Sequence, residues 1–569
     1  MTTDEEQNTK TRVDIVIVGG GPVGLLAANL AVKYGLSVRI VDIEFEPQHW
    51  GRGDWVHGRT LELLDHSGLA ADLLATGVRV EAFSHHHQQV STSIAYAPEH
   101  VVSKYKHVLC VGQHITESSL QHTLSEHDVQ VERPWTVSQF QKDGADSEYP
   151  LSVTLKHMLD NSTIDIRAKY LFGCDGAHSE IRKQLDIAYE GESSKKNHGV
   201  LDALVQTSFH DRKSISFIKG PFGTHACMFP RENNLVRVMV QLSDEGDRNQ
   251  IHLETVQHEA RRALLPHRVE FIGTMWWTIY RVGQHVATHY TSSQEDPRIF
   301  LCGDACHSQS PTLGQGLNTG FGDVFNLVWK IAMVESGHAK STLLNTYENE
   351  RRPVAEQVIA LDKQIVQAAE SKEQENLEAL LRQHQLFISG FGISYGHGDN
   401  GVMIQTGDRA PDFKVVHYAT GAKVRLYDVW RQQVQSSSSM MGGGWGFHLL
   451  VLAHDITQSM DAVIKGLKDF TVPSWMHVHI ITTTVQKGVI EKQLSQHQQQ
   501  QDVEGGIVID PQWVYMDKIN QAQCHHGLIQ DYNSNNNNNK NDPVAIVVRP
   551  DLHIGWIGDF SKLSLGFIA

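Results

Sequence analysis

The chain has 569 residues, of which 40% are hydrophobic and 20% are charged, and its formal net charge is −16. This length exceeds what one hydrophobic core can organise, so we expect two to four domains. The negative balance, with no basic patch in the sequence, speaks against a nucleic-acid partner or an anionic membrane surface.

The sequence also bears on the compartment in which the protein works. The first stretch, MTTDEEQNTKTR, is polar and acidic and lacks the apolar core of a signal peptide. The sequence contains no run of about 18 apolar residues, so no membrane span is expected. The cysteines number six, too few for a disulfide framework. We therefore expect a cytoplasmic protein.

The first predicted element covers residues 13–42, VDIVIVGGGPVGLLAANLAVKYGLSVRIVD, which is typical of strand, glycine turn, helix and second strand. Gly19, Gly21 and Gly24 form the spacing G-x-G-x-x-G, which suits a tight turn, close approach of a pyrophosphate and close helix packing. The helix start attracts phosphate, and Asp42 can accept hydrogen bonds from a ribose. This predicts one dinucleotide site. The alternative is a glycine-rich turn without a ligand.

Further along, residues 169–185 and 298–330 again indicate strand, turn and helix, and helical patterns continue to about residue 385. Between them the sequence is β-rich, as in LVRVMVQL. We therefore predict an α/β domain interleaved with a β-rich domain. The expected boundaries are 1–190 for the first part of the α/β domain, 191–295 for the β-rich domain, 296–385 for the second part and 386–406 for a linker.

Residues 407–569 restart with the strand-like runs KVRLYDV, FHLLVLA, VHIITTT and VAIVVR, which predict a separate small α/β domain. Three low-complexity inserts, QSSSSMMGGG, QHQQQQ and NSNNNNNKN, are expected to form loops. The domain has no C-x-x-C motif and only Cys524. A structural or dimer-forming role is therefore expected, not dithiol chemistry.

The stretch CGDACHSQSPTLGQGLN, residues 302–318, allows three interpretations. A metal site would use Cys302, Asp304, Cys306 and His307, but no second ligand pair follows at zinc-site spacing. A nucleophile site would use a serine beside His307, but neighbours on one loop seldom have triad geometry. The third interpretation is a backbone cradle, and we favour it.

In that cradle, Asp304 ends a strand and can bind a polyol hydroxyl group. The helix that opens near Gly316 presents N–H groups at Leu317 and Asn318, and a helix start stabilises negative charge. A reduced flavin needs such an environment. No metal is expected.

Together these motifs resemble a known family. The glycine turn, CDGAHSEIR (174–182) and GDACHSQSPTLGQGLNTGFGDVFNLVWK (303–330) resemble the three motifs of single-component FAD-dependent aromatic hydroxylases. FPRENNLVRVMVQL (229–242), WWTIYRVGQ (276–284) and TYENERRP (346–353) are similar to the branch of phenol 2-monooxygenases and 3-hydroxybenzoate hydroxylases. GDRAPDF (407–413) resembles the start of that branch's C-terminal thioredoxin-like domain.

The resemblance implies a Rossmann-type FAD-binding domain interleaved with a β-rich substrate domain, plus a thioredoxin-like domain, in a homodimer. It implies that FAD is held by a set of residues spread along the chain: Gly19, Gly21, Gly24, Asp42, Gly51, Arg52, Gln113, Asp175, Asp304, Gly314, Gly316, Leu317 and Asn318. It also implies that Asp54 and Tyr280 form an acid–phenol pair at the substrate and that the Pro311 carbonyl faces the substrate.

The reaction implied by the family is hydroxylation of a phenolic ring. NADPH or NADH reduces FAD, dioxygen adds to give a flavin hydroperoxide, and one oxygen atom is transferred to the ring. Asp54 would act as the base, because a phenolate is far more nucleophilic than a phenol whose pKa is about 10. Alternatives are oxidative dearomatisation or Baeyer–Villiger-type insertion on a polyketide, or a flavin-fold binding protein without catalysis.

Some positions depart from the family pattern. Trp55 and His57 stand where smaller or amide side chains are expected, and His225 is a further candidate for the substrate pocket. Most of the 34 histidines, including those of SHHHQQ (84–89), are expected on the solvated surface.

Overall fold

The computed structural model describes residues 11–51, 53–87, 90–211, 213–242, 247–370, 374–396, 405–412, 414–436, 446–453, 456–482, 488–492, 494–495, 509–517 and 543–564. The chain forms two compact units. The first comprises residues 1–61, 69–328 and 344–391, and the second comprises 62–68, 329–343 and 392–569. No helix among the described residues is long and apolar enough to cross a membrane.

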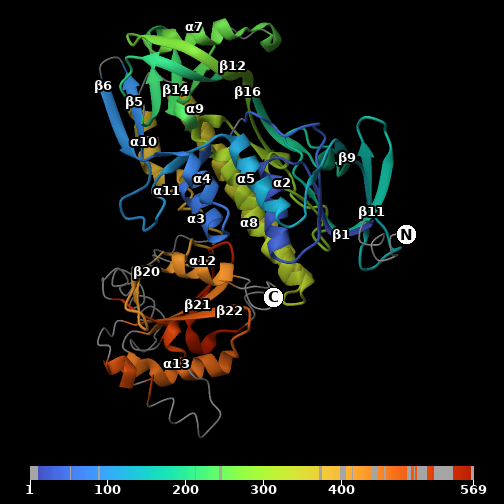
Figure 1. Ribbon diagram of the computed structural model, residues 1–569, viewed down its shortest axis with the longest axis vertical. Helices are drawn as coiled ribbons and strands as arrows, with labels where there is room; N and C mark the ends of the chain where they lie inside the picture. The colour runs from blue at the N-terminus through green and yellow to red at the C-terminus, as the bar shows by residue number, and fades with distance from the viewer. Residues whose placement is uncertain are drawn as a thin grey trace. The chain divides into compact units, whose positions relative to one another are not determined.

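The first unit is built on a seven-stranded sheet, and its strand β1 comes directly before the N-terminal glycine motif (Figure 1). Strand β1 (Arg12–Val18) is buried at Ile15, Val16 and Ile17, and it pairs in parallel with β2 (Val38–Val41) and β11 (Thr163–Gly173). The parallel set is completed by β8 (Val131–Glu132) beside β2 and β17 (Ile299–Leu301) beside β11. Strands β9 (Trp135–Lys142) and β10 (Leu151–His157) extend it in antiparallel fashion. This is the α/β arrangement predicted from the sequence.

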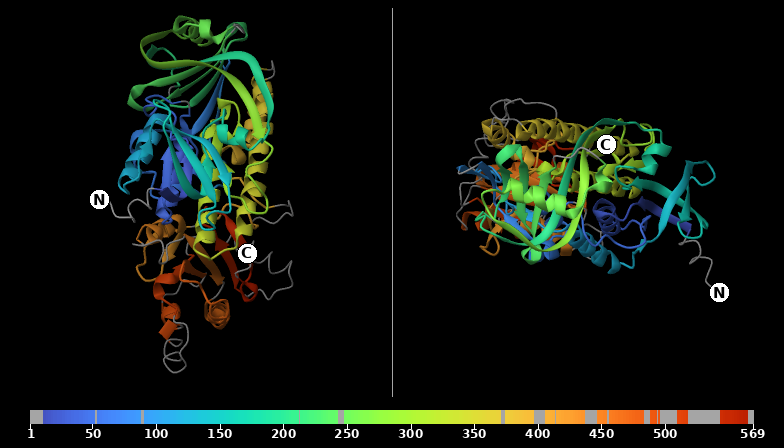
Figure 2. Two further views of the ribbon diagram at one scale, coloured as in Figure 1. Left: turned by 90° about the vertical axis from the view of Figure 1, so that its right-hand side faces the viewer. Right: turned by 90° about the horizontal axis from the view of Figure 1, so that it is seen from above.

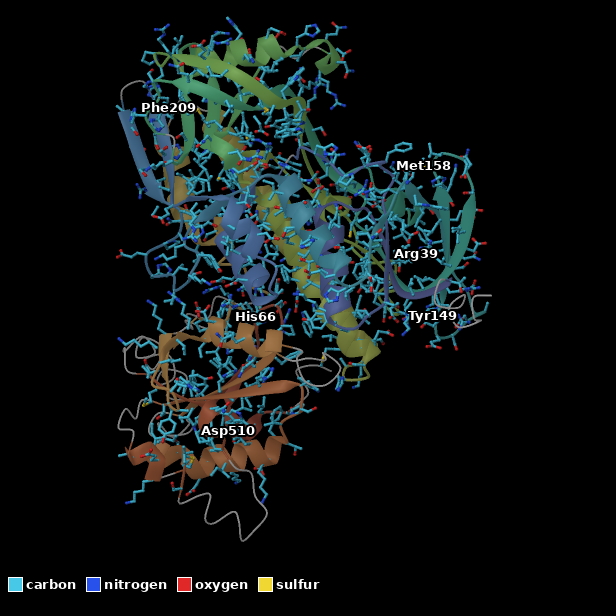
Figure 3. The ribbon with its side chains drawn as sticks, viewed as in Figure 1. Arg39, His66, Tyr149, Met158, Phe209 and Asp510 are labelled. Carbon is cyan, nitrogen blue, oxygen red and sulfur yellow. The ribbon has the colours of Figure 1, made fainter. Side chains whose placement is uncertain are left out.

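Helices cover this sheet and tie it together. Helix α2 (Pro22–Lys33) follows β1 directly, and Asn29 on it donates to the Leu120 carbonyl of α5 (Gln113–Ser125) at 3.0 Å. Arg39 of β2, labelled in Figure 3, pairs with Glu132 of β8 at 2.6 Å. The other helices of this unit and its border are α3 (Gly58–His66), α4 (Ala71–Thr76), α6 (Glu180–Gln184), α7 (Leu253–Ala263), α8 (Gln315–Glu335), α9 (Thr346–Glu370), α10 (Gln374–Gln383) and α11 (Gln385–Ile388).

A second, eight-stranded sheet has the order β18-β16-β12-β15-β14-β13-β5-β6. Its longest members, β12 (Tyr189–Thr207) and β16 (Val269–Ala287), pair antiparallel along nearly their whole length and are prominent in Figure 2. Helix α7 packs on one face around Val256 and Phe209, and Gly199 of β12 leaves room for Val256, because a Cβ there would lie 2.6 Å from Val256 Cγ1. The remaining strands are β5 (Ala82–His87), β6 (Val90–Ala95), β13 (Ile215–Lys219), β14 (His225–Pro230), β15 (Val236–Gln241) and β18 (His307–Ser308).

Strand β5 overturns one expectation from the sequence. His85 and His86 are not on the solvated surface but buried, because the His85 ring stacks on Phe217 and the His86 ring packs against Phe209. The two glutamines that follow, residues 88 and 89, lie outside the described residues. A small three-stranded sheet of β3 (Trp55–Val56), β7 (Val108–Cys110) and β4 (Val78–Val80) completes the unit.

The second unit contains a seven-stranded sheet in the order β20-β19-β23-β22-β21-β24-β25. Strands β21 (Phe447–Ala453), β22 (Met476–Thr482) and β23 (Val514–Met516) run in parallel, while β19 (Lys414–His417), β20 (Lys423–Arg425), β24 (Val544–Val548) and β25 (Ile554–Asp559) are antiparallel to their neighbours. Helices α12 (Leu426–Ser436) and α13 (Ile456–Phe470) belong to it. Apart from the end of α12, the low-complexity inserts and Cys524 lie outside the described residues.

Candidate functional site

The glycine turn after β1 has the geometry of a phosphate cradle. Gly19 has φ +108°, and a Cβ there would lie 2.3 Å from the Cys174 carbonyl oxygen. A Cβ on Gly24 would lie 2.0 Å from the Gly19 carbonyl oxygen, so strand and helix meet at these glycines. At Gly21, by contrast, no described atom lies within 4 Å of an added Cβ. The start of α2 therefore faces open space, where its N–H groups can receive a pyrophosphate.

Asp42 is fixed beside this turn. Its carboxylate accepts the N–H groups of Gly20 at 2.5 Å and Glu44 at 2.8 Å, and it pairs with Arg133 at 2.9 Å. An ionised carboxylate can accept about four hydrogen bonds. Asp42 therefore keeps capacity for a ribose hydroxyl, as the sequence predicts.

Asp175 lies on the other side of the turn, close to Gly19. One of its carboxylate oxygens accepts the N–H groups of Glu180 and Ile181 at the start of α6. The other oxygen, Oδ1, is buried and has no hydrogen-bond partner among the described residues. Burial raises the pKa of Asp175. An unsatisfied buried acceptor at this position fits a hydroxyl group of a bound dinucleotide.

The loop around residues 51–53 and the start of α8 come together, although they are far apart in the sequence. The Gly53 N–H donates to Gln113 Oε1 at 2.9 Å, and a Cβ on Gly53 would lie 3.5 Å from Leu317 Cβ. Gly51 packs so closely on Gln113 that a Cβ would lie 2.1 Å from the Gln113 Cβ. The structure thus assembles the residues predicted to surround a flavin ring. Arg52, predicted with them, lies outside the described residues.

The turn before α8 depends on a glycine in the left-handed conformation and on hydrogen bonds of Asn318. Gly314 has φ +61°, and a Cβ there would lie 2.4 Å from the Trp55 ring. Asn318 donates to the Trp55 carbonyl at 2.8 Å and accepts the His57 N–H at 2.8 Å. Both bonds are made by the backbone of Trp55 and His57, the two positions that depart from the family pattern, and they tie this backbone to the start of α8. A Cβ on Gly316 would meet only the Gln309 side chain, at 3.6 Å.

His57 is a structural tie and not a member of the substrate cavity described below. Its ring nitrogens lie 2.9 Å from the Leu313 carbonyl oxygen and 2.9 Å from the Tyr96 hydroxyl. Burial lowers its pKa to about 4, so the ring is neutral at physiological pH.

Both cysteines of CGDACH, Cys302 and Cys306, are buried, and burial raises the pKa of the Cys306 thiol well above its ordinary value. Cys306, His307 and Asp323 lie close enough together to share an ion. The Asp323 carboxylate, however, is already bound to His307 at 2.7 Å and to Arg351 at 2.9 Å. Asp304, which is exposed, does not join this group.

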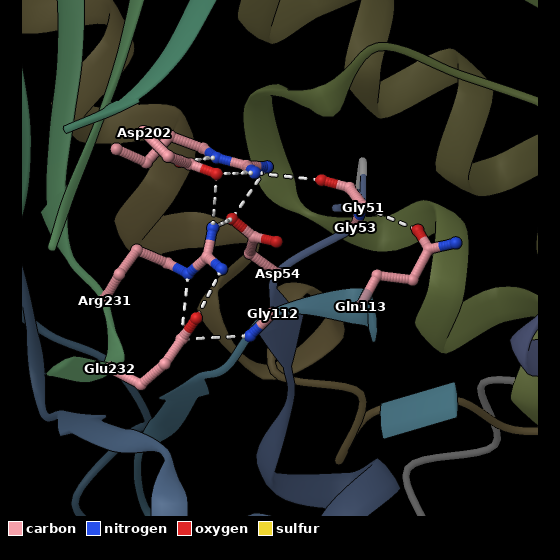
Figure 4. A network of polar contacts seen from close by, with 9 residues as sticks. Gly51, Gly53, Asp54, Gly112, Gln113, Asp202, Arg231 and Glu232 are labelled. Atoms are coloured by element: carbon pink, nitrogen blue, oxygen red, sulfur yellow. Dashed lines mark hydrogen bonds and ion pairs between the residues drawn. The ribbon is translucent and has the colours of Figure 1, made fainter. Parts of the chain in front are cut away.

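Asp54 sits in a buried cluster of charges next to Gly51 and Gly53, the residues of the predicted flavin loop (Figure 4). Its Oδ2 pairs with Arg231 at 2.5 Å and with Arg237 at 2.7 Å. Asp202 bridges the same two arginines, and Glu232 pairs with Arg231 at 2.7 Å. The other Asp54 oxygen, Oδ1, has no hydrogen-bond partner among the described residues.

Three carboxylates therefore share two guanidinium groups in this cluster, leaving one negative charge in excess. Burial raises the pKa of Asp54 to about 7, against the lowering effect of Arg237 and Arg231. The cluster is also tied to the flavin loop, since Arg237 donates to the Gly51 carbonyl at 2.9 Å and Glu232 accepts the Gly112 N–H at 3.1 Å. Sequence reasoning missed Arg231, Arg237, Asp202 and Glu232 as parts of the site, although FPRENN contains two of them.

A cavity of about 150 Å³ opens on the eight-stranded sheet. Its volume is several times that needed for one water molecule. Tyr280 and His225 line it, and Thr312 brings it next to Pro311. Burial raises the pKa of Tyr280, so its hydroxyl stays protonated. The described residues that line it are His85, His86, His198, Phe217, Ile218, Lys219, His225, Ala226, Cys227, Met239, Gln241, Tyr280, Val282, Thr312, Val366, Ala368 and Leu377.

The two residues predicted to form an acid–phenol pair, Asp54 and Tyr280, therefore lie in two different places. Tyr280 lines the cavity, whereas Asp54 belongs to the charge cluster and is not among the described residues that line the cavity. Arg237 links the two places, because it pairs with Asp54 and its charge also acts on Tyr280.

Comparison with known proteins identifies the family to which the chain is related. The model of the family described as "FAD binding domain" matches residues 12–362. The chain is 28% identical to phenol 2-monooxygenase fsqG of Aspergillus fumigatus over 98% of this chain and 95% of that protein. It is 29% identical to 3-hydroxybenzoate 4-monooxygenase of Comamonas testosteroni over 68% of this chain and 66% of that one. The crystal structure of the flavin-dependent monooxygenase PieE in complex with FAD and substrate superposes with a TM-score of 0.69 at 19% identity, covering 98% of both chains.

Proposed function

The chain belongs to the FAD-binding-domain family, and from this premise we propose that it hydroxylates a phenolic substrate with dioxygen and NAD(P)H. It is an FAD-dependent monooxygenase. One observation supports the proposal most strongly. Three elements meet in the first unit: the open glycine cradle, the loop at Gly51 and Gly53, and the start of α8. The cavity lined by Tyr280 lies in the same unit.

The residues present fit FAD. Gly19, Gly21, Gly24 and Asp42 would hold its pyrophosphate and ribose, with Asp175 and Asp304 contacting further hydroxyl groups. Gly51, Gln113 and the segment from Gly314 through Gly316 and Leu317 to Asn318 would surround the ring, and we retain Arg52 in this set. Bound FAD, once reduced by NAD(P)H, supplies an activated oxygen atom for the substrate ring.

The chain's own contribution is to place the substrate and move one proton. We propose that Tyr280 holds the phenolic oxygen, with the Pro311 carbonyl at the edge of the substrate. Asp54 is not among the described residues that line the cavity, and we retain it as the proposed acceptor of the phenolic proton, on Oδ1, which has no other hydrogen-bond partner among the described residues. Arg231 and Arg237 hold Asp54 in position.

The cofactor and the reaction can be tested on the purified protein. We expect a yellow protein that releases FAD on mild denaturation, and a phenol-dependent consumption of NAD(P)H that yields a product heavier by one oxygen atom. The measurements are an absorption spectrum before and after denaturation and the mass of the product. A folded, colourless protein that takes up no added FAD would contradict the proposal.

Asp42→Ala is expected to weaken FAD binding by about 1–3 kcal/mol, the scale of a hydrogen bond to a charged group. The change removes the acceptor of the Gly20 N–H and the predicted ribose contact together. Affinity is measured by titrating the FAD-free protein with FAD and following FAD fluorescence. Asp14→Ala is the matched control, because Asp14 pairs with Lys169 at the other end of β1 and should leave FAD affinity unchanged. Equal affinity of Asp42→Ala and wild type would remove Asp42 from the site.

We further propose that the second unit is a thioredoxin-like domain without redox chemistry that supports a homodimer in the cytoplasm. The absence of C-x-x-C from the sequence supports this, as does a sheet with three parallel strands flanked by antiparallel ones. The boundaries proposed above assign residues 407–569 to it. Light scattering tests the dimer, and a Cys524→Ser variant with undiminished turnover is the expected result.

A further inference from the structure

The cavity is spread along its sheet. Six adjacent strands contribute to its lining, from β16 with Tyr280 through β12, β15, β14 and β13 to β5 with His85. Val366 and Ala368 of α9 and Leu377 of α10 line it as well. Neighbouring strands lie about 4.8 Å apart. Tyr280 on β16 and His85 on β5 are separated by five strand spacings along the sheet, so the two residues line opposite ends of the cavity.

His85 is built into the far end of the cavity as an unsatisfied hydrogen-bonding group. Its side chain is only 2% exposed, and its ring stacks on Phe217 at 5.2 Å with an interplanar angle of 16°. Its Nε2 has no hydrogen-bond partner among the described residues. A buried polar atom of this kind costs about 1–3 kcal/mol until a partner arrives. A ligand oxygen that reaches this nitrogen would remove that cost.

The lining is also poor in charge. Burial lowers the pKa of His85 to about 4, so its imidazole is neutral at physiological pH. Lys219 is the one lysine or arginine in the lining, and it already has an interaction within the protein. A carboxylate buried here would lack a dedicated cation, and an unpaired buried charge is strongly unfavourable. The other walls are apolar, with Phe217, Ile218, Met239 and Val282 among them.

We propose that the cavity takes an elongated, uncharged phenol, whose hydroxylated ring lies at Tyr280 and whose second oxygen function, one ring length or more away, hydrogen-bonds to His85. This assignment rests on the proposed function and deepens it. It names His85 as a residue that determines specificity and excludes aromatic carboxylates as good substrates.

The test compares four compounds of graded length and charge on the FAD-loaded enzyme: 4,4′-biphenol, 4-phenylphenol, phenol and 3-hydroxybenzoate. Dissociation constants are measured by calorimetry, and product formation is measured separately. We expect 4,4′-biphenol to bind about tenfold more tightly than 4-phenylphenol, the effect of one hydrogen bond to a buried group. Phenol and 3-hydroxybenzoate should bind more weakly than either.

His85→Phe preserves the ring stacked on Phe217 and removes the nitrogen. We expect it to weaken binding of 4,4′-biphenol about tenfold and to leave 4-phenylphenol unchanged, while His85→Gln restores part of the difference. The matched control is His107→Phe, because His107 is also a buried histidine but does not line the cavity. It should leave both affinities as in wild type.

The outcomes separate this inference from the proposed function. Equal binding of 4,4′-biphenol and 4-phenylphenol by wild type overturns the role of His85, as does a His85→Phe variant with unchanged selectivity. Binding of 3-hydroxybenzoate as tight as that of 4,4′-biphenol overturns the argument from charge. In these cases oxygenation of the phenols would still support the proposed function. If the protein holds FAD but neither binds nor oxygenates any of the phenols, the proposed function itself fails.

Discussion

Asp54→Asn is expected to slow oxygen transfer to a neutral phenol by roughly 10²–10⁴, the range typical for loss of a general base. Asn keeps the size of the side chain and can still accept from Arg231 and Arg237, so FAD content should be preserved. Reduced enzyme would then consume oxygen without hydroxylating the ring. The measurement is product formed, and hydrogen peroxide released, per NAD(P)H consumed.

The pH dependence gives an independent check of the same residue. Because burial raises the pKa of Asp54 to about 7, the base form dominates above this pH and is lost below it. Product per NAD(P)H in wild type should rise with pH through about 7, and Asp54→Asn should flatten the profile. The deficit of the variant should shrink for a phenol that is already ionised at the assay pH. Wild-type yield from a neutral phenol in Asp54→Asn would show that another group is the base.

Arg231→Met is expected to lower the free energy of unfolding by about 3–5 kcal/mol, the cost of breaking a buried ion pair on one side. Three buried carboxylates would be left with Arg237 alone. The quantity is measured by denaturant unfolding. The deficit should decrease as the pH falls, because protonation of the carboxylates removes the unpaired negative charge.

The control for this variant is an arginine on helix α7, which packs on the same eight-stranded sheet. Arg262 pairs with Glu259 three residues earlier on α7 and is about one-third exposed. Arg262→Met should cost less than about 1 kcal/mol. If Arg231→Met were as stable as Arg262→Met, the charge cluster would not contribute to the folded state as its burial indicates.

The local parts of the fold could be predicted from the sequence. The nearly continuous run of Val and Ile in β1 and the spacing of Gly19, Gly21 and Gly24 describe one strand, one turn and one helix within a short window, and the structure has all three. The same is true of the strand, turn and helix around residues 298–330. In these places the conformation is decided by neighbours in the sequence.

The charge cluster and the far end of the cavity could not be predicted in this way. Asp54 and Arg231 meet only because β3 and the end of β14 are brought together by tertiary packing, and no local pattern records that pairing. The run AFSHHH has the polarity of a surface segment. His85 and His86 are buried because their rings pack against Phe217 and Phe209, which lie more than 120 residues further along the chain.

The order of strands in the seven-stranded sheet has a consequence for how the chain is made on the ribosome. β1 emerges first, but its neighbour β11 pairs Val18 with Gly173, and Gly173 in turn pairs with Leu301 of β17. At a synthesis rate of about 5–20 residues per second, the apolar edge of β1 waits many seconds for its first long-range partner. The parallel part of this sheet is therefore complete only when more than half of the protein has been translated. Chains that stop earlier expose an unpaired hydrophobic edge, and this makes them substrates for chaperones or for aggregation.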